Sequence, residues 1–199
     1  SWSTSTSLVA FKPTTKEELQ TAVDLWVTDN ETALVTYGEI NTWDVSLITS
    51  MSFLFQSKTT FNDDISNWDV SNTTDMNSMF NGASSFNQDI STWNVSNVTD
   101  MFQMLRGTQS FNQDISTWDV SNVSSMTFMF WGAINFNQDL SNWIVTGVTN
   151  MEGVFQQATA FNGDISNWDV SNVTKADKMF YFATNFNGDI SNWDVSNVT

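Results

Sequence analysis

Seven tryptophans recur at intervals of 25 residues, and this period constrains the fold more than any other feature of the sequence. They are Trp43, Trp68, Trp93, Trp118, Trp143, Trp168 and Trp193. Phenylalanines keep the same period from Phe61 to Phe186, with nothing inserted or deleted between copies. A strict period of this length is typical of stacked repeat proteins, in which each unit contacts mainly its neighbours. The fold is therefore decided largely within one unit.

Each unit contains two apolar patterns, as the copy around Trp93 shows. Trp93 and Val95 alternate about a polar residue, which predicts a short strand with both apolar side chains on one face. Met101, Met104 and Leu105 follow the i, i+3, i+4 spacing of one helical face, and a hydroxyl residue able to cap that helix precedes them. The sequence predicts one parallel strand and one short helix per unit.

The chain divides into three parts. Residues 1–12 are polar and low in complexity and are interpreted as a flexible arm. Residues 13–39 do not repeat; Thr15 and Glu18 form a capping box, and the segment is expected to be a helical cap over the first coil. Residues 40–199 hold six full units and part of a seventh. Because the repeat stops within a unit, we expect either a continuing chain or a docking neighbour at the last strand.

Composition excludes several classes of function. The chain has no cysteine and no histidine, which removes disulfides, thiolate metal sites and the Ser-His-Asp arrangement. A net charge of -16 would repel a nucleic acid backbone. No apolar run is long enough to span a membrane, and no catalytic constellation is present among the repeated carboxylates. We therefore expect no enzymatic activity, no nucleic acid partner and no membrane span.

The string I-x-x-W-x-V-x-x-V-x-x-M-x-x-M-F-x-x-A-x-x-F-N-x-D at residues 65–89 resembles the BspA-like surface-protein repeats. These are a branch of the leucine-rich repeat superfamily that includes mycoplasma-type surface lipoproteins. The resemblance covers residues 40–199 and implies a right-handed α/β solenoid with a parallel sheet, an extracellular or cell-surface location and no enzymatic activity. Valines such as Val98 occupy the position of the usual asparagine, so we expect the family's asparagine ladder to be lost or moved.

One acidic position recurs without exception. It is occupied by Asp64, Asp89, Asp114, Asp139, Asp164 and Asp189. Two interpretations stay open: an Asx turn, in which each carboxylate accepts backbone amides, or a row of Ca²⁺ sites completed by neighbouring carbonyls. A second position holds Asp44, Asp69, Asn94, Asp119, Ile144, Asp169 and Asp194, and we interpret it as a solvated acidic face or, alternatively, a cation site.

The tryptophans and the glycosylation sequons also form columns. The indoles are either a core ladder or a stacked platform for carbohydrate, and their sharing of a face with valine favours the core. Possible N-glycosylation sites begin at Asn30, Asn72, Asn94, Asn97, Asn122, Asn172 and Asn197, although the hydroxyl residues of five of them also have the predicted helix-capping role.

The preferred function is structural: an extracellular repeat protein that builds a surface layer or fibre through end-to-end or lateral self-association. The alternative is an adhesin that recognises a host protein or glycan through its repeat face. A binding site needs local departures from the repeat, and these occur at Arg106, Trp131, Ile144, Gly147, Lys175, Lys178 and Tyr181. We interpret them as scattered over different repeat positions, which favours the structural function.

Overall fold

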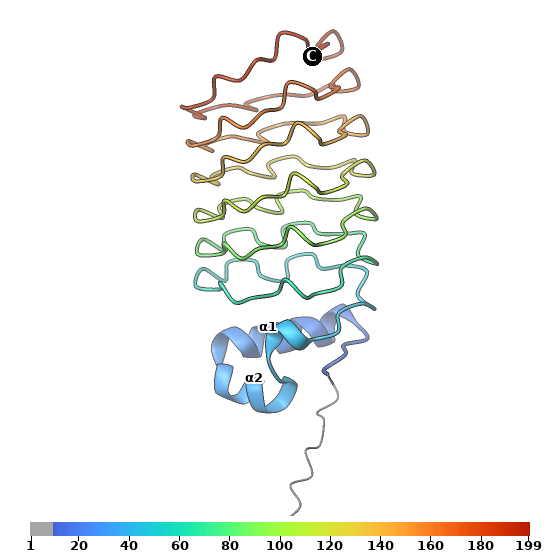
Figure 1. Cartoon of the computed structure of the whole chain (residues 1–199), viewed down its shortest axis with the longest axis vertical. Coiled ribbons are helices and arrows are strands. Elements are labelled where there is room, and N and C mark those ends of the chain that lie inside the picture. Colours follow the sequence, from blue (N-terminus) through green and yellow to red (C-terminus); the bar gives the residue numbers. More distant parts are fainter. Residues whose placement is uncertain (1–9) are drawn as a thin grey trace, which may run out of the picture.

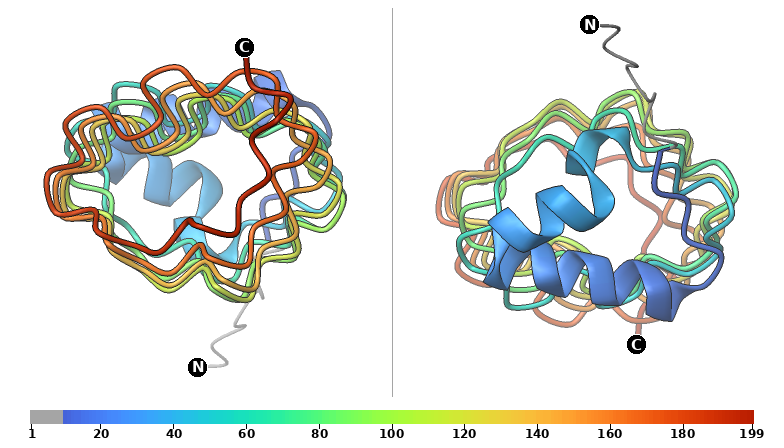
Figure 2. Two further views of the ribbon diagram at one scale, coloured as in Figure 1. Left: turned by 90° about the horizontal axis from the view of Figure 1, so that it is seen from above. Right: turned by 90° about the horizontal axis from the view of Figure 1, so that it is seen from below.

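The computed structural model describes residues 10–199 and shows an elongated stack of coils, closed at one end by helices (Figure 1). Helix α1 spans Lys16–Thr28, helix α2 spans Asn30–Tyr37, and the short 3-10 helix η1 spans Ile40–Thr42. The coils that follow lie nearly on top of one another when viewed along the stack (Figure 2). Each coil uses one 25-residue unit, so residues one period apart become neighbours.

Helix α1 covers the first coil. Its capping box is confirmed, because the Thr15 hydroxyl accepts a hydrogen bond from the Glu18 amide while the Glu18 side chain bonds back to the cap. Leu19, Ala22, Val23 and Trp26 on one face of the helix are all buried. The Trp26 ring packs edge-on against Trp43 of the first coil, with 5.8 Å between ring centroids. The helical end of the stack therefore shields the first layer from water.

The strand and helix predicted for each unit are wrong. Within residues 10–199 the helices all lie before Trp43, and the repeats contain isolated parallel bridges, such as Asp75 to Asp100, in place of strands. The coils are built from consecutive turns. The chain is therefore not an α/β solenoid of the leucine-rich-repeat type, which the sequence pattern and the resemblance had both predicted.

The helix predicted from Met101, Met104 and Leu105 is instead a run of turns, because its backbone amides bond in two directions. The amides of Met101, Gln103 and Leu105 donate to carbonyls of the next coil at 2.8–3.0 Å. The Met104 amide donates instead to the Met101 carbonyl, three residues back. Gln103 has a φ of 55°, in the left-handed region that an α-helix does not contain. The i, i+3, i+4 spacing still places the three apolar side chains of this segment in the core.

The predicted strand fails for a related reason. The Trp93 amide donates to the Ile90 carbonyl of its own coil at 3.2 Å, so it is not available to a neighbouring strand. One residue later, the Asn94 side chain accepts the Ser96 amide and closes a second turn. Two tight turns within seven residues leave no length for a strand, although Trp93 and Val95 do share the inner face.

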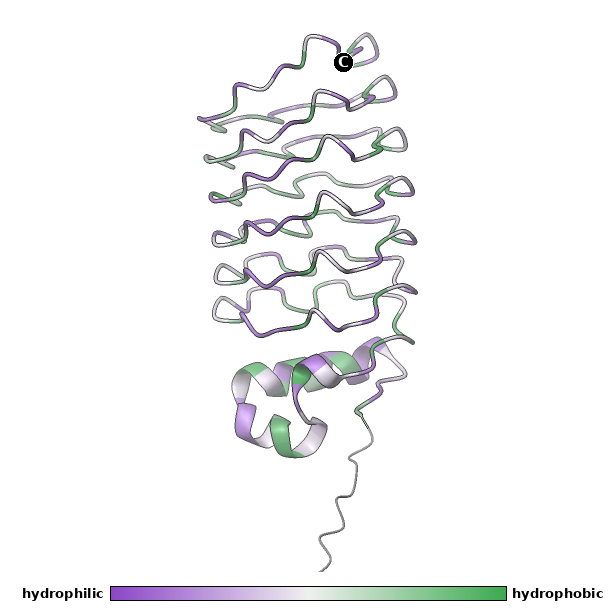
Figure 3. Cartoon of the chain, in the orientation of Figure 1, coloured by the Kyte–Doolittle hydropathy of each residue, from purple (hydrophilic) through white to green (hydrophobic). Residues whose placement is uncertain are grey.

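The core consists of aromatic and aliphatic ladders that run the length of the stack. Phe111 lies between Phe86 and Phe136, with centroid distances of 5.9 and 6.0 Å and nearly parallel rings. Short hydrophobic and hydrophilic stretches alternate along every coil (Figure 3). Burial of the ladders against their neighbours supplies the cohesion that one 25-residue coil lacks on its own.

Asparagine side chains form a further ladder, at a position the sequence analysis did not identify. The Asn87 side-chain oxygen accepts the backbone amide of Asn112 at 2.9 Å, and Asn112 does the same for Asn137 at 2.8 Å. The contact continues to Asn162 and Asn187. These bonds join equivalent residues of successive coils and hold the coils in register.

Candidate functional site

The tryptophan column lies in the core. Six of its members are 2–4% exposed, and Trp193 of the last coil is partly buried. From Trp68 onward each indole N–H donates to a carbonyl 28 residues earlier, as Trp118 does to Ile90 at 3.1 Å. The indoles thus connect adjacent coils and are not available as a carbohydrate platform.

The invariant aspartate column forms Asx turns. In all six coils the carboxylate accepts the backbone amide of the serine two residues later, at 2.8–2.9 Å; Ser91 on Asp89 and Ser116 on Asp114 are examples. Residues 10–199 contain no group of three or more acidic side chains able to hold a metal ion. Calcium binding at these aspartates stays a prediction. If it is right, the protein should have a higher melting midpoint in the presence of calcium than in the presence of a chelator.

The second acidic column uses the same turn. Its aspartates and Asn94 each accept the amide of the serine two residues later, at 3.0–3.2 Å. Ile144 interrupts the column and is 57% exposed. At the first member, hydrogen bonds from Lys12 and then Ser46 lower the pKa of Asp44 to about 2. The two columns together give the stack a repetitive acidic surface.

These turns predict a loss of stability in acid. Hydrogen bonds from the hydroxyl and the backbone amide of Ser121 hold the pKa of Asp119 below its ordinary value of 3.8, and Asp64 and Asp189 are lowered by their own serines. Because the folded pKa is lower than the unfolded one, this stabilisation is complete above about pH 4 and is lost as pH falls through the folded pKa. The melting midpoint should therefore fall between pH 4 and pH 2.

Asp119→Asn provides the matched variant for this prediction, because Asn94 makes the same turn without a titrating group. The variant should melt close to wild type at pH 7 and lose less of its midpoint at pH 2.5. Equal losses in the two proteins would contradict a contribution from this turn.

The asparagines of the repeated sequons are exposed. The side-chain amides of Asn72, Asn97, Asn122, Asn172 and Asn197 donate to carbonyls of the preceding coil at 2.7–3.0 Å. The serine or threonine two residues after each of these asparagines was predicted to cap a helix. Its hydroxyl donates instead to a carbonyl of the preceding coil, as Thr99 does to Thr74 at 3.2 Å. Asn30 is the first residue of α2, and Asn94 belongs to the second acidic column. Glycosylation stays a prediction that intact mass would test.

Sequence variation is concentrated on a different part of each coil. We define the variable face as residues 52, 53, 56 and 57 and their equivalents every 25 residues. Its third position holds five residue types in six coils: Gln56, Asn81, Arg106, Trp131, Gln156 and Tyr181. The two residues between these pairs, at 54 and 55 in the first coil, stay apolar and buried in every complete coil except for the partly buried Phe180. The four positions of the variable face differ between coils; most of their residues reach the surface, whereas Ser52, Ser78, Thr127 and Gln156 are buried.

This arrangement corrects the interpretation that the departures are scattered. Arg106, Trp131 and Tyr181 occupy one repeat position, because their numbers differ by multiples of the 25-residue period. Lys178 belongs to the second position of the same face. Ile144 and Gly147 lie in the other part of the coil. The residue numbers alone therefore predict that Arg106, Trp131 and Tyr181 lie on the same part of the stack.

Arg106 and Trp131 are in direct contact on this face. The guanidinium carbon of Arg106 lies 4.0 Å from the centre of the Trp131 ring system, a cation–π contact. Phe128 approaches the same indole at 5.2 Å, and the indole N–H donates to the Gln157 side chain at 3.3 Å. Arg106, Trp131 and Gln157 border a shallow pocket of about 400 Å³, which Asn81 also lines.

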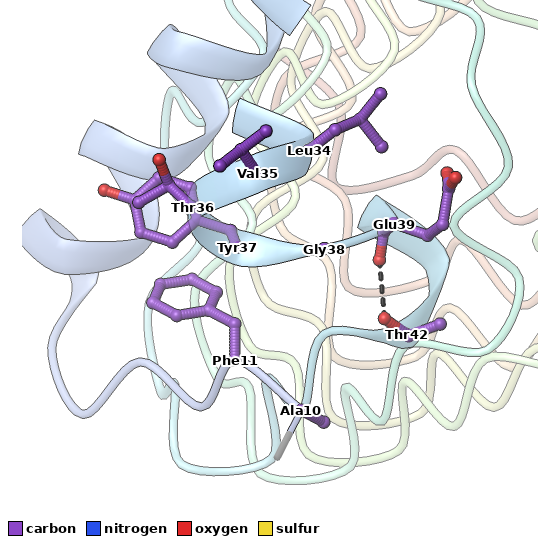
Figure 4. Close-up of a pocket in the computed structure, with 9 residues that line it drawn as sticks. All are labelled: Ala10, Phe11, Leu34, Val35, Thr36, Tyr37, Gly38, Glu39 and Thr42. Carbon is purple, nitrogen blue, oxygen red and sulfur yellow. Dashed lines mark hydrogen bonds between the residues drawn. The ribbon is translucent and has the colours of Figure 1, made fainter. Parts of the chain in front are cut away.

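A larger pocket, of about 680 Å³, lies at the helical end between α2 and the segment before α1 (Figure 4). Phe11 and Tyr37 pack against each other across it, with ring centroids 4.5 Å apart. Glu39 is its sole titratable group besides Tyr37, and the Glu39 carbonyl accepts the Thr42 hydroxyl. This lining offers packing for the cap and no convergent set of polar side chains.

Comparisons with known proteins identify one family. A family model described as "Mycoplasma protein of unknown function, DUF285" matches residues 27–143 and again residues 111–199. No curated protein and no solved structure matches the chain. None of the helices within residues 10–199 has the length and apolar character needed to cross a membrane.

Proposed function

This chain belongs to the family of Mycoplasma proteins of unknown function DUF285, and we propose that it is a binding module that presents its variable face to a ligand. The observation that carries the proposal is the contrast between the two sides of each coil. One side repeats the same turns and ladders, whereas the variable face changes residue type from coil to coil. Neighbouring coils place equivalent residues side by side, so the exposed members of this face lie along the same part of the stack.

The chemistry of the variable face supports recognition. Three of the four basic residues in the repeats lie on or next to this face, namely Lys58, Arg106 and Lys178, and the acidic Glu152 and Asp177 lie on it as well. Exposed aromatic side chains are there as well, including Tyr181 at 50% and Phe182 at 57% exposure. Aromatic residues and arginine are the side chains most enriched at binding hot spots. The repeated aspartate columns, by contrast, are already engaged in turns.

We include in this proposal that the chain is related to the BspA-like surface repeats, which is more specific than its membership of the DUF285 family. It supports a location outside the cell or on its surface, where a stack of coils could hold the variable face away from the membrane. The leucine-rich-repeat fold that accompanied this resemblance is not part of the proposal, because the coils lack its strands and helices.

The test compares wild type with a Trp131→Gln, Tyr181→Gln double variant on immobilised glycans and extracellular matrix proteins. Glutamine is a suitable replacement because Gln56 and Gln156 occupy the same position in other coils. Wild type should bind at least one member of the panel, and the double variant should bind it at least about tenfold more weakly. Ile144→Asp, which restores the repeat on the acidic side, is the control and should bind like wild type.

Two results would overturn the proposal. One is the absence of any bound panel member in the wild type at high protein density. The other is equal binding by wild type and the double variant, which would place recognition on another surface.

Self-association, as a structural layer or fibre, is the second candidate. It is favoured by apolar side chains that are exposed within the stack, where Leu47 is 50% exposed and Ile144 is 57% exposed. Light scattering should then show a dimer or larger species that Ile144→Asp disperses, and a strict monomer at high concentration would contradict it.

A further inference from the structure

Arg106 is the one arginine of the chain, and it lacks an acidic partner. The ion pairs within residues 10–199 join Lys12 to Asp44 and Lys58 to Asp24. Its guanidinium is held instead over the Trp131 ring at 4.0 Å. A guanidinium stacked on an aromatic ring keeps its N–H groups at the edge of the plane, where they can bind a carboxylate through two parallel hydrogen bonds.

The rest of the pocket is lined by neutral polar groups and apolar carbon, and no carboxylate borders it. Asn81, Gln109 and Gln157 contribute side-chain amides. The Gln157 oxygen accepts the Trp131 indole, which leaves its amide N–H groups for a ligand. Ile134, 38% exposed, adds an apolar patch. Amides that both donate and accept suit hydroxyl groups, while apolar carbon suits the C–H face of a sugar ring.

We propose that this pocket binds a saccharide that carries a single carboxylate, of the uronic acid class, with the carboxylate on Arg106. This inference rests on the proposed binding function and names its ligand. The pocket volume of about 400 Å³ falls in the range of small-molecule sites. A net charge of -16 would repel densely sulfated polymers, so one local cation in an anionic protein selects for a ligand of low charge.

The experiment titrates ¹⁵N-labelled protein with a non-sulfated oligosaccharide containing glucuronic acid, and separately with the equal-length oligosaccharide in which glucose replaces it. The readout is the indole N–H signal of Trp131, assigned by its loss in Trp131→Gln. The acidic sugar should shift this signal in a saturable manner and bind at least about tenfold more tightly than the neutral one.

Two variants separate the site from general charge. Arg106→Gln should reduce affinity for the acidic sugar at least about tenfold, to the level of the neutral sugar. Lys178→Gln removes the same charge elsewhere on the variable face, and glutamine is accepted there because Gln103 occupies the equivalent position; its affinity should stay within about twofold of wild type. Free glucuronate and acetate, titrated alongside, show whether the sugar ring contributes beyond the carboxylate.

The inference is overturned if both oligosaccharides bind equally, if neither shifts the Trp131 signal, if acetate binds as tightly as the acidic oligosaccharide, or if the two charge variants lose affinity equally. The proposed function fails separately. It stands if the glycan and protein panel still yields a ligand that depends on Trp131 and Tyr181, and it falls with this inference if the panel yields none.

Discussion

Replacement of Phe136 by alanine is expected to destabilise the stack by about 3–5 kcal/mol. The Phe136 ring is fully buried and stacks on Phe111 and Phe161, with 6.0 Å between centroids in both directions, and on Phe130 at 4.3 Å. Removal of the ring opens a cavity between three coils. The neighbouring coils cannot close around it, because backbone and asparagine hydrogen bonds fix their spacing.

Urea unfolding followed by tryptophan fluorescence would measure this loss. Tyr181→Ala is the control, since its aromatic ring is half exposed and its removal should cost less than about 1 kcal/mol. A loss below about 1 kcal/mol for Phe136→Ala would mean that the phenylalanine ladder does not hold adjacent coils together.

Trp118→Phe is the second large effect, with an expected loss of about 2–4 kcal/mol. The indole is 3% exposed, and its N–H donates to the Ile90 carbonyl of the preceding coil at 3.1 Å. Phenylalanine keeps an aromatic ring at this position but provides no donor and fills less volume. The Ile90 carbonyl would then stay buried without this partner, which costs more than the bond itself is worth in water.

Trp193→Phe offers a matched control in the last coil. Trp193 makes the equivalent bond, to Ile165 at 3.2 Å, but it is only partly buried, so water can replace the lost donor. Its loss should be less than about 1.5 kcal/mol in the same urea measurement. Equal losses for the two variants would show that burial does not determine the strength of this contact.

The period predicted the arrangement of residues in space more reliably than it predicted secondary structure. The inward-facing positions follow the spacing of Trp93, Val95, Met101, Met104 and Leu105, all of which are buried. The same spacing fits a run of turns as well as it fits a strand and a helix, because both place these residues on one side. Left-handed φ angles at non-glycine residues such as Gln103 distinguish the run of turns from a helix. These angles could not be predicted, because such residues rarely adopt them.

For the candidate site, the repeating positions were less informative than the positions that vary. The first acidic column is invariant, yet its members, such as Asp89 and Asp114, are used by turns that every coil needs. Arg106 and Trp131 are informative because they differ from their equivalents, and their shared column follows from the numbering alone. Their contact could not be predicted, because it depends on the direction in which two side chains leave adjacent turns.

The central claim is that each coil separates the residues that hold the stack together from those that face a ligand. The most direct test is the free energy of unfolding of Trp118→Gln and Trp131→Gln, one chemical change placed on the core ladder and on the variable face. We expect a loss of more than about 3 kcal/mol for Trp118→Gln and less than about 1 kcal/mol for Trp131→Gln. Similar losses for the two variants would contradict the claim.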